Sequence, residues 1–136
     1  MTEKERLQKA SEYHAAGYNC CQSVLLALED LTGLPESAAG VGYCFGGGMQ
    51  RGLVCGALSG GLMALGACLK GSTPNDNRPL ARSTAIALEQ AFEHEFGTVM
   101  CSEILAANGK RICGECIDFC VKTTAELIKK INKGEP

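Results

Sequence analysis

Cysteine is the residue type with which this chain could do chemistry, and it occupies nine of the 136 positions. The nine are Cys20, Cys21, Cys44, Cys55, Cys68, Cys101, Cys113, Cys116 and Cys120. The odd number, with no apolar segment of a secretory signal in "MTEKERLQKA", argues against a disulfide framework. In a reducing cytoplasm, cysteines bind metal, do redox chemistry or pack as small hydrophobic residues. We therefore expect a cytoplasmic protein with a cysteine-based site.

Four of these cysteines fall near the expected amino-terminal ends of helices. Cys20 follows a natural cap, Asn19, and Cys55 falls in the second turn of a glycine-rich helix. Cys101 and Cys116 fall in the first turns of the last two helices. A helix amino terminus carries about half a positive charge and unbonded N–H groups, which stabilise a thiolate. We predict that the four sulfurs converge on one anionic centre.

The elements that must position them are helices almost throughout. Apolar periodicity and end signals predict helices and one helical turn ending in a glycine loop. The helices span 3–16, 20–32, 50–69, 79–96, 99–107 and 115–132, and the turn and loop span 36–49. The segment "GSTPNDNRP" is expected to be a loop with Pro79 opening the next helix. Strand signals are weak and no repeat is present, which predicts a single domain, 1–136, folded as a compact all-α bundle of about five helices around the glycine-rich one.

The central stretch "RGLVCGALSGGLMALG", residues 51–66, keeps glycine where it weakens a helix. Gly52, Gly56 and Gly60 are spaced i, i+4, i+8, so one helix face would lack side chains and let other backbones approach Cys55. The uncharged residues 52–69 reach the lower length limit of a membrane span. Because the other segments are amphipathic, we expect a buried central helix and no membrane span.

Composition excludes several other functions. The net charge is −2 and aromatic residues make up 5%, so no basic stripe or stacking surface for nucleic acid is expected. No serine–histidine–aspartate set, paired-carboxylate cleft or phosphate-binding loop can be recognised. His14, on an apolar helix face, and His94, among glutamates, are interpreted as structural and solvated residues respectively.

Four motifs carry a resemblance that covers residues 10–130. They are "GYNCCQSVL", "GGGMQRGLVCGALSGGLMALG", "FGTVMCSEIL" and "CIDFCVKTTAEL". In this order and spacing the chain resembles the redox-active C_GCAxxG_C_C family. The resemblance implies that Cys20, Cys55, Cys101 and Cys116 are the reactive or metal-binding residues, and that Gly56 and Gly60 adjoin the cofactor. A similar domain in split-Soret cytochromes accompanies an iron–sulfur centre, but no CxxCH motif is present here, so haem is not implied.

Five cysteines are additional to that pattern. Cys113 and Cys120 compete with Cys116, because "CGECIDFC" spaces the three on one helix face. Cys113 is the better candidate for a mobile partner of Cys116. Of Cys20 and Cys21, one is expected to face the site and the other to pack. Cys44 and Cys68 are expected in the core.

Three functional hypotheses remain open at this point. Four separated thiolates could hold an iron–sulfur cluster for electron transfer, the hypothesis we favour. Alternatively, the cysteines form a metal-free thiol–disulfide relay. In the third hypothesis they hold structural zinc, or merely pack in a binding module without redox activity. The first two imply an oxidoreductase or an electron-transfer accessory protein with an unidentified redox partner protein. A homodimer formed through an exposed part of the glycine-rich helix is a further open alternative.

Overall fold

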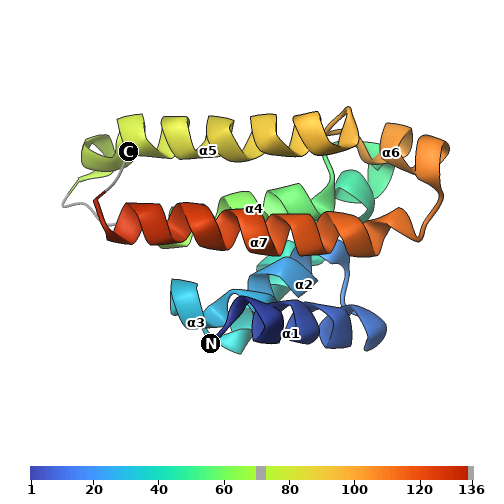
Figure 1. Ribbon diagram of the computed structural model, residues 1–136, viewed down its shortest axis with the longest axis horizontal. Helices are drawn as coiled ribbons and strands as arrows, with labels where there is room; N and C mark the ends of the chain where they lie inside the picture. The colour runs from blue at the N-terminus through green and yellow to red at the C-terminus, as the bar shows by residue number, and fades with distance from the viewer. Residues whose placement is uncertain (70–72, 135–136) are drawn as a thin grey trace.

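A computed structural model describes residues 1–69 and 73–134, which are almost entirely helical (Figure 1). Its α-helices are α1 (Glu3–Ala15), α2 (Cys20–Ala27), α3 (Glu29–Thr32), α4 (Gly56–Ala67), α5 (Pro74–Phe96), α6 (Cys101–Asn108) and α7 (Ile112–Asn132). Between α3 and α4 lie a 3-10 helix, η1 (Glu36–Phe45), and a short turn, η2 (Gly48–Gly52). The all-α prediction is confirmed for this part of the chain, although its helical segments outnumber the five or so expected.

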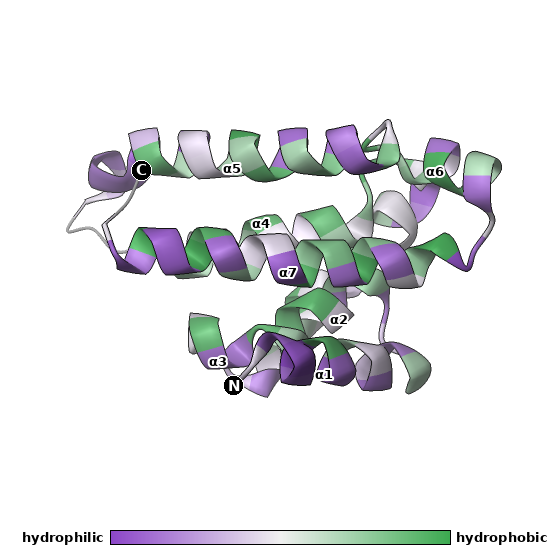
Figure 2. Ribbon diagram, in the orientation of Figure 1, coloured by the Kyte–Doolittle hydropathy of each residue, from purple (hydrophilic) through white to green (hydrophobic). Residues whose placement is uncertain are grey.

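The glycine-rich helix α4 lies at the centre of the bundle. It contacts α2, α3, α5, α7 and η1. Figure 1 shows α5 along one edge, α4 and α7 in the middle, and α1 to α3 along the other edge. Within that group α2 lies on the inner side, against α4 and α7, and is mostly hydrophobic, whereas α1 lies on the outer side and is mostly hydrophilic (Figure 2). No helix within residues 1–69 and 73–134 has both the length and the hydropathy needed to cross a membrane.

A reciprocal cap fixes the start of α2, and with it the position of Cys20. The Asn19 side-chain oxygen accepts from the Gln22 backbone N–H at 2.9 Å, and the Gln22 side-chain oxygen accepts from the Asn19 N–H at 3.1 Å. The Asn19 amide also donates to the Tyr43 carbonyl at 2.9 Å, which ties the cap to η1. Cys20 is therefore the first residue of α2, as predicted, whereas the expected helix over 20–32 is interrupted at Leu28.

The start of α5 was predicted five residues too late. Thr73 and Asp76 form a capping box, and Pro74 takes the first helical position, where its missing N–H costs nothing. Pro79 consequently lies inside α5 rather than at its start. Of the expected loop, Gly71 and Ser72 fall outside the described residues.

The start of α4 was predicted six residues too early, because the chain before it turns the wrong way for a right-handed helix. Four consecutive residues have φ between 59° and 66°, a left-handed run that costs about 1–2 kcal/mol for each residue with a Cβ. They are Gly47, Gly48, Met49 and Gln50. Gly52, with φ +72°, also lies outside α4, so the side-chain-free face of the helix contains Gly56 and Gly60 but not Gly52.

Gly60 sets the distance between α2 and α4. A Cβ atom placed on it would lie 2.7 Å from the Cys21 carbonyl oxygen and 3.1 Å from the Val24 Cβ. A Cβ atom placed on the neighbouring Gly61 would lie 2.6 Å from the Thr124 hydroxyl oxygen of α7. The expectation that glycine lets neighbouring helices approach the central one closely is met at these positions.

We expect Gly60→Ala to lower the free energy of unfolding by about 1–3 kcal/mol, because the added methyl group must push the α2 backbone away. Gly66→Ala is the matched control in the same helix. A Cβ there meets nothing within 4 Å, so we expect a gain of up to ~1 kcal/mol from helix propensity. Urea denaturation of both variants measures the difference, and equal stabilities would contradict the assigned contact.

Candidate functional site

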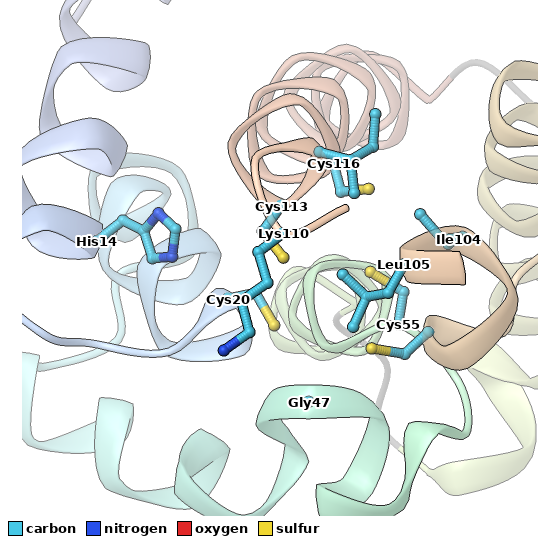
Figure 3. Close-up of a pocket in the computed structure, with 11 residues that line it drawn as sticks. His14, Cys20, Gly47, Cys55, Ile104, Leu105, Lys110, Cys113 and Cys116 are labelled. Atoms are coloured by element: carbon cyan, nitrogen blue, oxygen red, sulfur yellow. The ribbon is translucent and has the colours of Figure 1, made fainter. Parts of the chain in front are cut away.

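A cavity of about 380 Å³ lies where several helices begin (Figure 3). Five of its lining residues are cysteines: Cys20, Cys55, Cys101, Cys113 and Cys116. The other lining residues are His14, Gly47, Ile104, Leu105, Lys110 and Ile112. The four cysteines expected to converge thus share one cavity, and Cys113 joins them. Which of the five do chemistry stays a prediction.

Cys55 and Cys101 are brought together by a short antiparallel bridge between Val54 and Met100. The Cys55 N–H donates to the Val99 carbonyl at 2.8 Å, and the Cys101 N–H donates to the Leu53 carbonyl at 2.6 Å. Each cysteine directly follows a bridged residue and stands at the start of its helix, α4 or α6. This isolated bridge, rather than a helix–helix contact, places the two sulfurs on the same cavity.

Gly56 and Gly47 surround the Cys20 sulfur. A Cβ on Gly56 would lie 2.5 Å from the Cys20 Sγ and 2.8 Å from the Phe45 carbonyl oxygen, so only glycine leaves room for the sulfur there. Burial raises the pKa of the Cys20 thiol, while a hydrogen bond from the Gly47 N–H opposes that rise. The left-handed turn thus presents a backbone donor to this sulfur.

Cys55 is the thiol most inclined to ionise. A hydrogen bond from the Cys116 thiol lowers the Cys55 pKa to about 7, helped by the N–H groups of Leu58 and Ala57 and opposed by burial. These two N–H groups are available because Cys55 is the N-cap of α4 rather than a second-turn residue as predicted. The same hydrogen bond, together with burial, raises the pKa of Cys116.

The three cysteines of α7 differ from the prediction in their positions along the helix. The helix begins at Ile112, three residues earlier than predicted, so Cys113 lies in its first turn and Cys116 in its second. Burial raises the pKa of Cys113, and the nearby Lys110 ammonium works against this rise. Cys120, the other competitor, is fully buried and lies outside the cavity lining.

The remaining cysteines lie outside this cavity. Cys21 is buried and its thiol approaches the Met63 sulfur at 3.8 Å, so of the adjacent pair Cys20 faces the cavity and Cys21 packs, as expected. Cys68 is in the core, as predicted, with its sulfur 3.6 Å from the Leu31 carbonyl oxygen. Cys44 was expected in the core but is exposed, because η1 presents it to solvent.

Two cavity residues were missed or misread in the sequence. His14, interpreted as a structural histidine, is exposed and stands at the edge of the cavity, and Lys110 was not singled out. Neither has a sequence signal, since His14 reaches the site through the packing of α1, and Lys110 through the connection between α6 and α7. His94 is exposed on α5, as expected for a solvated residue.

The sulfurs surround a volume rather than a point. Among the described residues, no group of three or more histidine, cysteine, aspartate or glutamate side chains is arranged to hold a metal ion. A single zinc ion needs four ligands within about 2.3 Å of one centre. In its present arrangement the site is therefore not a preformed single-ion site.

An all-α fold with thiols from separate helices around one cavity defines a cysteine-centred class of protein. The chain belongs to the family described as "Putative redox-active protein (C_GCAxxG_C_C)", which matches residues 18–131. No curated protein and no solved structure gave a match. The central motif of that family corresponds here to Cys55 through Gly60, the N-cap and first residues of α4.

In reduced, metal-free protein we expect one thiol to titrate with a pKa of about 7, seen as ultraviolet thiolate absorption. Cys55→Ser should abolish this transition, Cys116→Ala should move it upward because the hydrogen-bond donor is lost, and Cys44→Ser should leave it unchanged. The folded pKa lies below the ordinary 9.0 of the unfolded chain. The stability that the Cys55 thiolate contributes is therefore full above pH 9 and lost as the pH falls through 7. A transition that persists in Cys55→Ser would contradict the assignment.

Proposed function

We propose that the protein is an electron-transfer protein in which Cys20, Cys55, Cys101 and Cys116 bind an iron–sulfur cluster. The observation that supports this is the arrangement of four thiols around one cavity, from α2, the N-cap of α4, α6 and α7. In a cluster each iron takes its own thiolate, so a cluster needs thiols spaced around a cavity and not gathered at one point. When bound, such a cluster supplies one-electron transfer.

The donor set and its surroundings fit a cluster. Thiolates are the ligands that iron–sulfur clusters require, and backbone N–H groups lower the pKa of two of the four thiols, Cys20 and Cys55. Such hydrogen bonds stabilise negative charge on sulfur and so raise a reduction potential. The apolar side chains of Ile104, Leu105 and Ile112 line the same cavity. Gly56 and Gly60 serve the site through close packing, Gly56 at the Cys20 sulfur itself.

Protein purified or reconstituted without air should be coloured, with iron and acid-labile sulfide in stoichiometric amounts. Serine at position 20, 55, 101 or 116 should lower the iron content and bleach the visible absorption, because an iron would lose its thiolate. Cys44→Ser is the matched control, since Cys44 is exposed away from the cavity. Cys113→Ser tests the fifth thiol: normal iron content in this variant, with loss in Cys116→Ser, would support the proposed ligand set. A colourless wild-type protein without iron would refute the cluster.

A second candidate, a metal-free thiol–disulfide relay in the cytoplasm, is favoured by the contact between Cys55 and Cys116. A thiol with a pKa near the ambient pH is the best attacking group in disulfide exchange, and Cys55 meets this condition. Its thiolate would attack a partner disulfide, form a mixed disulfide and release one partner thiolate. The Cys116 thiolate would then displace the second, leaving a Cys55–Cys116 disulfide and a reduced partner. Both candidates imply a redox partner protein.

The relay predicts one reversible disulfide in metal-free protein. After mild oxidation, peptide mass analysis should find Cys55 joined to Cys116, because these thiols are already hydrogen-bonded. Cys120→Ser serves as the control, since Cys120 is buried on the same helix but outside the cavity. Random pairing, or a bond that thioredoxin-type reductants cannot reverse, would contradict the relay.

A further inference from the structure

The cysteine cavity has a one-sided charge distribution. Of the described residues that line it, only Lys110 carries a fixed charge and none is an aspartate or glutamate, although the chain as a whole has a net charge of −2. In Figure 3 the Lys110 side chain extends past Cys113 toward Cys20. Apolar walls at Ile104 and Leu105 face the same space.

The backbone adds to this positive potential. The amino termini of α2, α4, α6 and α7 lie at the cavity, each contributing a partial positive charge and free N–H groups. His14 also lines a second, smaller cavity, together with Asp118 of α7. Within the cysteine cavity the Cys55 thiolate, whose pKa is about 7, is the negative group, and Lys110 is the fixed positive charge that faces it.

We propose that this cavity admits a small organic anion as the ligand or substrate of the thiol site, with Lys110 pairing with its charged group and Ile104 and Leu105 contacting its apolar part. The inference rests on the proposed function only in treating the cysteines as the reactive groups. It concerns the metal-free dithiol site, because a cluster held by the four thiolates would occupy the same cavity and add negative charge to it.

Two alkylating probes of similar size test the charge selection: iodoacetate, which is anionic, and iodoacetamide, which is neutral. Both react with the same thiolate, so the ratio of their rates cancels differences in thiol pKa. In reduced, metal-free protein the ratio is measured at Cys113, the partly exposed thiol beside Lys110, and at the exposed Cys44 as an internal reference. Peptide mass analysis resolves the two sites.

We expect a higher iodoacetate-to-iodoacetamide ratio at Cys113 than at Cys44. Lys110→Gln should lower the Cys113 ratio about fivefold, the effect of one unit charge about 4 Å away in water. Lys130→Gln, which removes an equal charge from the exposed far end of α7, should leave it unchanged. Salt at about 1 M should weaken the wild-type preference, because the screening length falls to about 3 Å.

Equal ratios at Cys113 and Cys44, or a Cys113 ratio that Lys110→Gln does not change, would overturn the proposal. Its failure can be told apart from failure of the cluster hypothesis by a separate measurement. Iron and sulfide content after reconstitution should be the same in Lys110→Gln and in wild type if Lys110 selects the ligand. Loss of iron in this variant would instead give Lys110 a structural role at the cluster and overturn its assignment as the ligand-selecting residue.

Discussion

The close contact between α2 and α4 is the constraint on which the site depends. Gly60 lets the two backbones approach at Cys21, and one turn earlier Gly56 leaves the space that the Cys20 sulfur occupies. A methyl group at either glycine would separate the helices or displace that sulfur. The two glycines therefore lower the helix propensity of α4, but they allow the sulfurs of Cys20 and Cys55 to line the same cavity. The proposed thiol site therefore depends on the close packing of α2 against α4.

Backbone geometry outside the helices completes the site. The left-handed turn before α4 places Met49 and Gln50 at positive φ, a conformation that costs about 1–2 kcal/mol per residue and persists only where the surroundings impose it. Here the Leu53 N–H donates to the Gly48 carbonyl at 2.8 Å and closes the turn, and Gly47 donates to the Cys20 sulfur. The turn is followed at once by the bridge that pairs Cys55 with Cys101. Strain and pairing in this short segment thus orient three of the cavity thiols.

The sequence allowed the helical class, the Asn19 cap and the shared cavity of Cys20, Cys55, Cys101 and Cys116 to be predicted, because each rests on local signals or on the motif spacing. The start of α4 could not be predicted, since a left-handed run that includes Met49 and Gln50 has no local signature and is imposed by tertiary contacts. The exposure of Cys44 was missed because η1 is a 3-10 helix whose faces differ from those of an α-helix. Lys110 and His14 join the site only when distant helices pack, which periodicity does not reveal.

The order in which the thiols ionise is the same for both candidate chemistries. The Cys55 pKa is lowered to about 7, whereas burial raises the pKa of Cys20, Cys101 and Cys113. The hydrogen bond to Cys55, together with burial, raises the pKa of Cys116. The other thiols give up their protons less readily than Cys55, and metal binding favours that loss. In both proposed chemistries Cys55 would therefore be the first thiolate to react, so a Cys55 variant alone does not discriminate between them. Cys20 and Cys101 carry the distinction, because a cluster requires their sulfurs and a Cys55–Cys116 relay does not.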